Sequence, residues 1–423
     1  MGTNPGGRED GGKHEYRPQR VGQIILPCLT GARGACRTAG YNSLEVSCPL
    51  NLSTSSLLIA VLCATSGRAE EGSPQAAPLP LEEISRRASE AWRANRNEEA
   101  LRWYREGVER NPSWDEGWWY LGSIHYEADR YAEARDAFAR VTELKPEASP
   151  AWALLGLTEY RLKDFDAALG HLLKWQSLGP AGSPEISRAA GLHLAMLLVR
   201  SGQFDLATRP LTWLASSQPE TPDLLTVCGL VILEMAVLPV DIPEPEKERA
   251  LVVGRAVYAA FAGHDAEAKV RFEEALRRYP GARGVRYAYG LVLSRTGSEE
   301  ALPVLRKETE LFPDDVHAHL QIAFDLLSRG RPTEALPSAR ESVRLAPRLF
   351  AAHLALGRAL AETDALDEGI RELERAAELA PDVADTYLAL ARAYARAGRT
   401  RDVERARAKL IDVERKRQMQ TNP

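Results

Sequence analysis

The stretch that decides the fold lies at residues 118–146 and reads WWYLGSIHYEADRYAEARDAFARVTELKP. The next stretch, residues 152–180, follows the same plan and reads WALLGLTEYRLKDFDAALGHLLKWQSLGP. Both stretches end in proline, and Pro112, Pro146 and Pro180 are spaced 34 residues apart. The same spacing separates Pro313, Pro347 and Pro381. A fixed period of this length predicts stacked repeats, in which each unit buries its apolar face against its neighbours.

Small and large residues recur in phase with the prolines. Each unit has an early small residue, at Ala88, Gly122, Gly156, Ala195, Ala256, Gly290, Ala323, Gly357 and Ala391. About twelve positions later a second one follows, at Ala100, Ala134, Ala168, Ala207, Ala268, Ala301, Ala335 and Gly369. Four positions further on comes a large apolar residue, as at Tyr104, Phe138, Leu172, Leu211, Phe272, Leu305 and Leu373. This pattern predicts two antiparallel helices per unit, with close backbone approach at the small residues and proline ending the second helix.

The offsets closely resemble the tetratricopeptide-repeat family. The family pattern is met by Trp118, Leu121, Gly122, Tyr126, Ala134, Phe138 and Pro146, and it recurs from Trp152 to Pro180 and from His353 to Pro381. Units beginning near residues 81, 115, 149, 188, 249, 282, 316, 350 and 384 make about nine copies. The resemblance implies an all-α, right-handed α-solenoid of helix-turn-helix units. It also implies a concave groove lined by each first helix, and a binding or scaffolding role without catalysis.

The period divides the chain into three parts. Residues 1–80 form a leader whose first fifty residues are rich in Gly, Arg, Pro and Thr, which predicts disorder. Residues 81–416 hold the repeats, and residues 417–423 form a tail. The net charge of −5 argues against a general nucleic-acid binder, because such a protein needs a basic face.

The leader contains a signal-like segment at residues 51–71. Its apolar run at residues 57–64 reads LLIAVLCA and is followed by SGRAE at residues 66–70. One interpretation is a secretory signal, which predicts a periplasmic or secreted protein of bacterial style. The other is a stray apolar patch in a cytoplasmic protein, because no basic residue stands at positions 51–56. A wrongly assigned start codon would reconcile export with the position of the run.

The period is interrupted near residues 222–248. A helix-like run at residues 223–237 is followed by the proline-rich stretch LPVDIPEP at residues 238–245. Because proline stops a helix, we expect a helix without its partner and then an extended loop. This segment is either a decayed repeat or a hinge or docking loop. The run is too short for a stable membrane span, and it contains Glu234.

Family geometry places one set of side chains along the groove of the first three units. These candidate partner-binding residues are Trp92, Trp119, Tyr120, Tyr126, Tyr160 and Arg161. Aromatic rings with polar tips suit an extended peptide or an exposed helix. The alternative is that they pack in the core. In later units, residues such as Met196, Val257 and Leu354 make the same positions apolar, which favours either an apolar ligand or packing between adjacent first helices.

Residues capable of chemistry give little sign of a reaction. The sequence holds no phosphate-binding glycine loop, no His-Glu-x-x-His and no serine elbow, so we predict no catalytic, cofactor-binding or metal residues. Cys228 stands in an apolar helix and is expected to be a buried, inert thiol. His319 and His353 share one phase in consecutive units and are expected to form core or interhelical hydrogen bonds.

The function that follows is a protein-interaction scaffold that binds peptide or partner-protein segments in its groove. An alternative is a recruiting or regulatory subunit of an envelope- or glycan-assembly enzyme complex. Neither function needs a cofactor, and the pattern makes no prediction of oligomeric state.

Overall fold

A computed structural model describes residues 79–421 of the 423-residue chain. The predicted disordered leader, apart from its last two residues, and the signal-like segment at 51–71 lie outside the described residues. Within them are nineteen α-helices, one short 3-10 helix and no strand. The helices are α1 (Leu81–Arg93), α2 (Asn97–Arg110), α3 (Asp115–Glu127), α4 (Tyr131–Leu144), α5 (Ser149–Arg161), α6 (Phe165–Leu178), α7 (Pro184–Arg200), α8 (Phe204–Ser217), α9 (Pro222–Ile232), η1 (Pro239–Asp241), α10 (Glu246–Phe261), α11 (Asp265–Arg278), α12 (Val285–Arg295), α13 (Ala301–Leu311), α14 (Val316–Ser328), α15 (Pro332–Leu345), α16 (Phe350–Ala361), α17 (Leu366–Leu379), α18 (Ala384–Arg396) and α19 (Thr400–Thr421).

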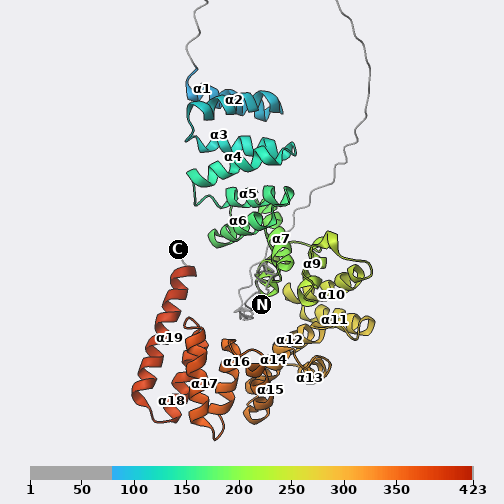
Figure 1. The fold of residues 1–423 in the computed structure, drawn as a ribbon, viewed down its shortest axis with the longest axis vertical. Coiled ribbons are helices and arrows are strands. Elements are labelled where there is room, and N and C mark those ends of the chain that lie inside the picture. Colours follow the sequence, from blue (N-terminus) through green and yellow to red (C-terminus); the bar gives the residue numbers. More distant parts are fainter. Residues whose placement is uncertain (1–78, 422–423) are drawn as a thin grey trace, which may run out of the picture.

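The helices pair and stack into a curved solenoid (Figure 1). Helices α1 to α6 form three stacked pairs, the stack turns at α7 to α10, and α12 to α19 continue it around the curve. First helices begin within four residues of every predicted start, the largest difference being Pro184 against residue 188. The last helix, α19, runs on to Thr421. The predicted all-α, right-handed solenoid is confirmed.

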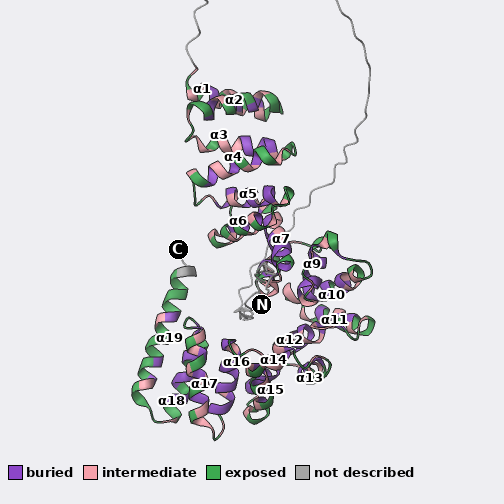
Figure 2. Cartoon of the chain, viewed as in Figure 1, coloured by how far each residue is buried: buried purple, intermediate pink, exposed green. Residues whose placement is uncertain are grey.

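Small residues of each first helix receive a large residue of the second helix. A Cβ atom added at Gly122 would lie 2.7 Å from the Phe138 ring, and one at Gly156 would lie 2.7 Å from Leu172. Gly290 with Leu305 and Gly357 with Leu373 repeat this contact. All the predicted second small residues and large residues are buried, and Figure 2 shows buried residues where paired helices face each other. The large residues therefore fill the space within a unit, as well as between units.

In five units the proline that ends the unit also accepts a hydrogen bond from the next first helix. Trp118 Nε1 donates to the carbonyl of Pro112 over 3.0 Å, and Trp152 Nε1 donates to that of Pro146 over 2.8 Å. The same bond is made by His319 to Pro313, His353 to Pro347 and Tyr387 to Pro381. Tryptophan, histidine and tyrosine share this position because each carries a donor of similar reach. The predicted hydrogen-bonding role of His319 and His353 is confirmed.

The interruption consists of two consecutive helices that both end as first helices do. In α9 the amide of Met235 donates to Leu230 and that of Glu234 donates to Val231, while Glu234 adopts φ 50°. This Schellman closure recurs at Gly263, after α10, where His264 donates to Ala259. The helix therefore ends at Ile232, five residues before the predicted end at 237.

Helix α9 has a partner, contrary to the expectation of an unpaired helix. It packs closely on α10, which also pairs with α11. A Cβ atom at Gly229 would lie 2.0 Å from the Ala250 carbonyl oxygen, and one at Gly254 would lie 1.8 Å from the Leu225 oxygen. The two backbones touch through glycine, and α10 takes the place of the missing second helix. Cys228, on α9, is fully buried, and burial raises the pKa of its thiol.

Candidate protein-interaction surface

The six predicted groove residues all lie on first helices of the first three units. Trp92 is on α1, Trp119, Tyr120 and Tyr126 are on α3, and Tyr160 and Arg161 end α5. The five aromatic side chains are half-buried and Arg161 is exposed. Four of them lie in two clusters, Trp92 with Tyr120 and Tyr126 with Arg161, and the other two, Trp119 and Tyr160, pack against neighbouring side chains. These positions are compatible with a binding surface, which stays a prediction.

The first cluster joins α1 and α3. The Tyr120 ring lies 6.2 Å from the Trp92 ring and stacks at 5.1 Å on Tyr104, which is fully buried. Trp92 and Tyr120 therefore rest on a fixed aromatic base and keep part of their surface accessible.

The second cluster joins α3 and α5 through a residue that the sequence reasoning missed. Tyr131, the first residue of α4, lies edge-on to Tyr126 with ring centroids 5.5 Å apart. The Arg161 guanidinium lies 4.7 Å from the Tyr131 ring centroid, and 3.7 Å from the Asp129 carboxylate. The stack of arginine on aromatic ring recurs one unit later, where Arg200 covers Phe165 at 4.6 Å. The sequence pattern that could have predicted this contact is an aromatic residue at the start of a second helix together with an arginine at the end of the next first helix.

Trp119 and Tyr160 make contacts typical of packing residues. The Trp119 ring lies edge-on to the buried Phe138 ring at 5.9 Å. The Tyr160 ring lies 4.4 Å from His193, and its hydroxyl is 3.8 Å from the Met196 sulfur. Burial raises the pKa of the Tyr160 phenol. First helices also contact each other, α5 with α7 and α14 with α16, so the apolar positions of later units are used at least in part by packing.

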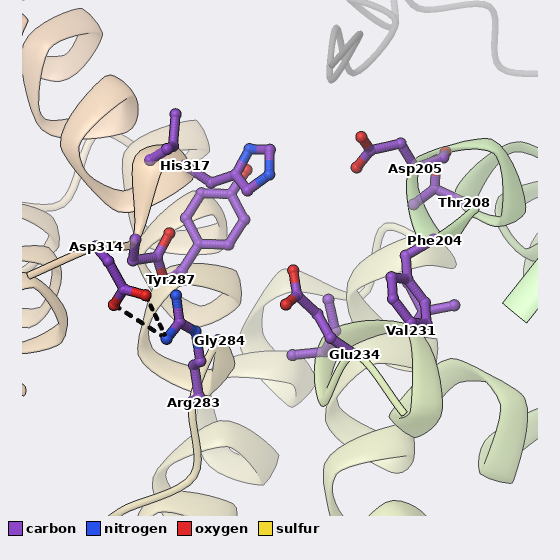
Figure 3. A pocket seen from close by; sticks show the side chains of 13 residues that line it. Phe204, Asp205, Thr208, Val231, Glu234, Arg283, Gly284, Tyr287, Asp314 and His317 are labelled. Carbon is purple, nitrogen blue, oxygen red and sulfur yellow. Dashed lines mark hydrogen bonds and ion pairs between the residues drawn. The ribbon is translucent and has the colours of Figure 1, made fainter. Parts of the chain in front are cut away.

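A pocket that the sequence did not predict lies at the bend, and we call it the bend pocket. It is formed by the start of α8, the end of α9 and the starts of α12 and α14, and it contains about 670 Å³ of unfilled space, counting the part open to solvent. Figure 3 shows Asp205 and Glu234 pointing into this space from one side, with Tyr287 and His317 on the other. The only feature of the sequence that marks this region is the break in the period near residues 222–248, where α9 and α10 follow each other as two first helices.

The amide donors at the two helix starts in the bend pocket already have carboxylate partners. Asp315 accepts a hydrogen bond from the Ala318 amide over 3.0 Å and so caps α14. Glu308, on α13, accepts one from the Gly284 amide over 2.5 Å at the start of α12. Arg283 pairs with Asp314 over 3.0 Å. One amide at each of these helix starts is therefore already bonded to a carboxylate.

Glu308 is a buried carboxyl next to this pocket. Its side chain is fully buried, and burial raises its pKa from 4.5 to about 7, with the Asp315 charge adding to the shift. The Gly284 amide, together with Arg286 and Arg283, acts in the opposite direction.

We expect Glu308→Gln to reduce the pH dependence of stability. Between pH 4.5 and about 7 the folded state binds more protons at Glu308 than the unfolded state does. The contribution of Glu308 to stability is therefore fully present below pH 4.5 and is lost as the pH rises to about 7. The loss is about 2 kcal/mol after allowance for partial screening. Urea midpoints at pH 5 and pH 8 should converge in Glu308→Gln. The control is Glu310→Gln, an exposed change on the same helix, and an equal pH dependence in both variants would refute the assignment.

The part of the chain that the structure describes holds no group of three or more His, Cys, Asp or Glu side chains placed to bind a metal ion. None of its helices is long and apolar enough to cross a membrane. The geometry defines a helical-repeat solenoid whose first helices carry partly accessible aromatic and arginine side chains.

The family comparison agrees with this class. The family model described as tetratricopeptide repeat matches residues 85–149, 127–183 and 320–384. The chain therefore contains tetratricopeptide repeats over residues 85–183 and 320–384. Among solved structures, it is similar to MamA 41-end from Desulfovibrio magneticus RS-1, at 23% identity over 40% of this chain and 96% of that chain, with a TM-score of 0.38. It is also similar to the APC/C hetero-tetramer Cut9-Hcn1, at 12% identity over 79% of this chain and 87% of that chain, with a TM-score of 0.36. No curated protein matches the chain significantly.

Proposed function

We propose that the chain is a protein-interaction scaffold that holds an extended segment of a partner protein along its inner face. The observation that carries the proposal is the cluster of Tyr126, Tyr131 and Arg161. It presents the exposed guanidinium of Arg161, on the first helix α5, oriented by the Tyr131 ring at the start of α4 and by the Asp129 carboxylate. Oriented arginine and aromatic side chains are the residues that most often dominate the energy of protein interfaces. We expect no catalysis from the repeats themselves.

The test begins with selection from a library of random linear peptides on the full chain. Peptides that bind should lose affinity about tenfold with Arg161→Ala, because a charged, stacked contact is removed. The melting temperature should change little, since Arg161 is exposed and its ion pair lies at the surface. Fluorescence anisotropy of a labelled selected peptide measures the affinity.

The control is Arg278→Ala, which removes another arginine that stacks on a tyrosine, Tyr279, from the end of a second helix. This variant should bind the peptides as the unchanged chain does. Failure to select any peptide, or equal loss in the two variants, would contradict a role for the inner face.

A further inference from the structure

The two carboxylates that point into the bend pocket have no close partner (Figure 3). The side-chain oxygens of Asp205 and Glu234 make no hydrogen bond or ion pair with the residues that the structure describes, and both residues are bonded only through their backbone groups. The other charges of the pocket are committed, because Arg283 pairs with Asp314 and Asp315 caps α14. Glu234 interacts electrostatically with Arg283 without forming an ion pair with it, so the pocket offers two carboxylates that no close cation neutralises.

The wall that faces these carboxylates is aromatic. The Tyr287 and His317 rings lie 5.8 Å apart, and the buried Val231 of α9 lines the pocket on the side of the carboxylates. Asp205, across the pocket, and Asp315, on the same side, both act electrostatically on the Tyr287 phenol. A ring face beside free carboxylates is favourable for a cation carried on an apolar stem.

An anion does not fit the same space. The Ala318 and Gly284 amides are already bonded to Asp315 and Glu308, and an anion would be repelled by Asp205 and Glu234. A purely apolar side chain would leave both carboxylates without a charged partner. Charge complementarity thus selects a basic group.

We propose that the bend pocket holds one basic side chain, arginine or lysine, of the partner segment bound along the inner face. The proposal rests on the proposed function and specifies the chemistry of the partner. The cationic head pairs with Asp205 and Glu234, its stem packs on Tyr287, and the segment follows the first helices α12 and α14, which Figure 1 places on the inner side of the curve.

The experiment uses the peptides selected on the full chain. We expect them to be enriched in arginine or lysine, and to lose this enrichment when the selection is repeated on Asp205→Asn/Glu234→Gln. A selected peptide should lose about tenfold in affinity for this double variant, and about tenfold when its pocket-binding arginine is replaced by neutral citrulline (or its lysine by norleucine). The two losses should not add, because both remove the same ion pair.

The matched control is Asp166→Asn/Glu133→Gln. Asp166 occupies in α6 the position that Asp205 occupies in α8, and both control residues are exposed. Melting temperatures of the two double variants show that both remain folded. Peptides that bind without a basic residue, or that bind both double variants equally, overturn the pocket assignment and leave the scaffold proposal intact. If no peptide binds the unchanged chain, both proposals fall.

Discussion

Replacing Gly254 by alanine is expected to destabilise the bend by about 2–3 kcal/mol, although alanine is the better helix former. The new Cβ atom would lie 1.8 Å from the Leu225 carbonyl oxygen and 3.1 Å from the Gly229 amide nitrogen. Both neighbours are backbone atoms, so no side chain can rotate to make room. Helices α9 and α10 must separate, and the gain of about 1 kcal/mol in helix propensity does not offset the lost packing.

Gly170→Ala is the matched control, because Gly170 also lies within a helix and nothing stands within 4 Å of its added Cβ atom. This change should be neutral or stabilising. Urea denaturation and hydrogen exchange of α9 and α10 measure the difference, since a repeat protein can open locally. If Gly254→Ala were as stable as Gly170→Ala, the close helix crossing would be wrong. Gly254→Ala should also weaken peptides that depend on the bend pocket, whose wall includes the end of α9.

The regular part of the fold was predictable because the same contact between the two helices recurs in each unit. A small residue opposite a large one, as in Gly122 with Phe138, is visible as a fixed offset in the sequence. Helix ends were predictable where glycine or proline marks them. Glu234 is neither glycine nor proline, yet it adopts the left-handed conformation that ends α9. The apolar run continues past this residue, and the sequence therefore suggested a longer helix.

The pairing of α9 with α10 was not predictable from local pattern. It depends on Gly229 and Gly254, which lie in different helices and on either side of a proline-rich loop. In the sequence, glycine inside a helix predicts only a lower helix stability, and its role in helix packing appears only when the opposing backbone is known. The bend pocket follows from that same tertiary contact, since its lining comes from four separate segments between residues 204 and 317.

The candidate surface was predictable in its location and less so in its composition. Family geometry selected Tyr126 and Arg161 on first helices, and the structure joins them through Tyr131, which belongs to a second helix. Trp119 was assigned to the groove by its position, but its ring packs on Phe138. A helix position fixes the direction of the Cα–Cβ bond, while side-chain torsions decide which neighbour a large ring contacts.

Ala134→Asp is expected to lower the stability of the first units by about 3 kcal/mol or more, because it buries a carboxylate without a partner. Ala134 is fully buried in a cluster with Phe138 and Leu155, where α4 packs on α5. Ala132→Asp makes the same change two residues away at an exposed position in the first turn of α4. A negative charge at a helix start is favourable, so this control should be neutral or slightly stabilising.

Tryptophan fluorescence during urea denaturation measures both variants, and Trp119, in contact with Phe138, reports directly on this cluster. Ala134→Asp should unfold at lower urea concentration and with a separate early phase, because the first units lose contact with the rest of the stack. Equal midpoints for the two variants would mean that the second small residue of each unit does not face the neighbouring helix. The position assigned to the second small residue of every unit, from Ala100 to Gly369, would then be wrong. The assignment of first helices to the inner wall would be wrong as well.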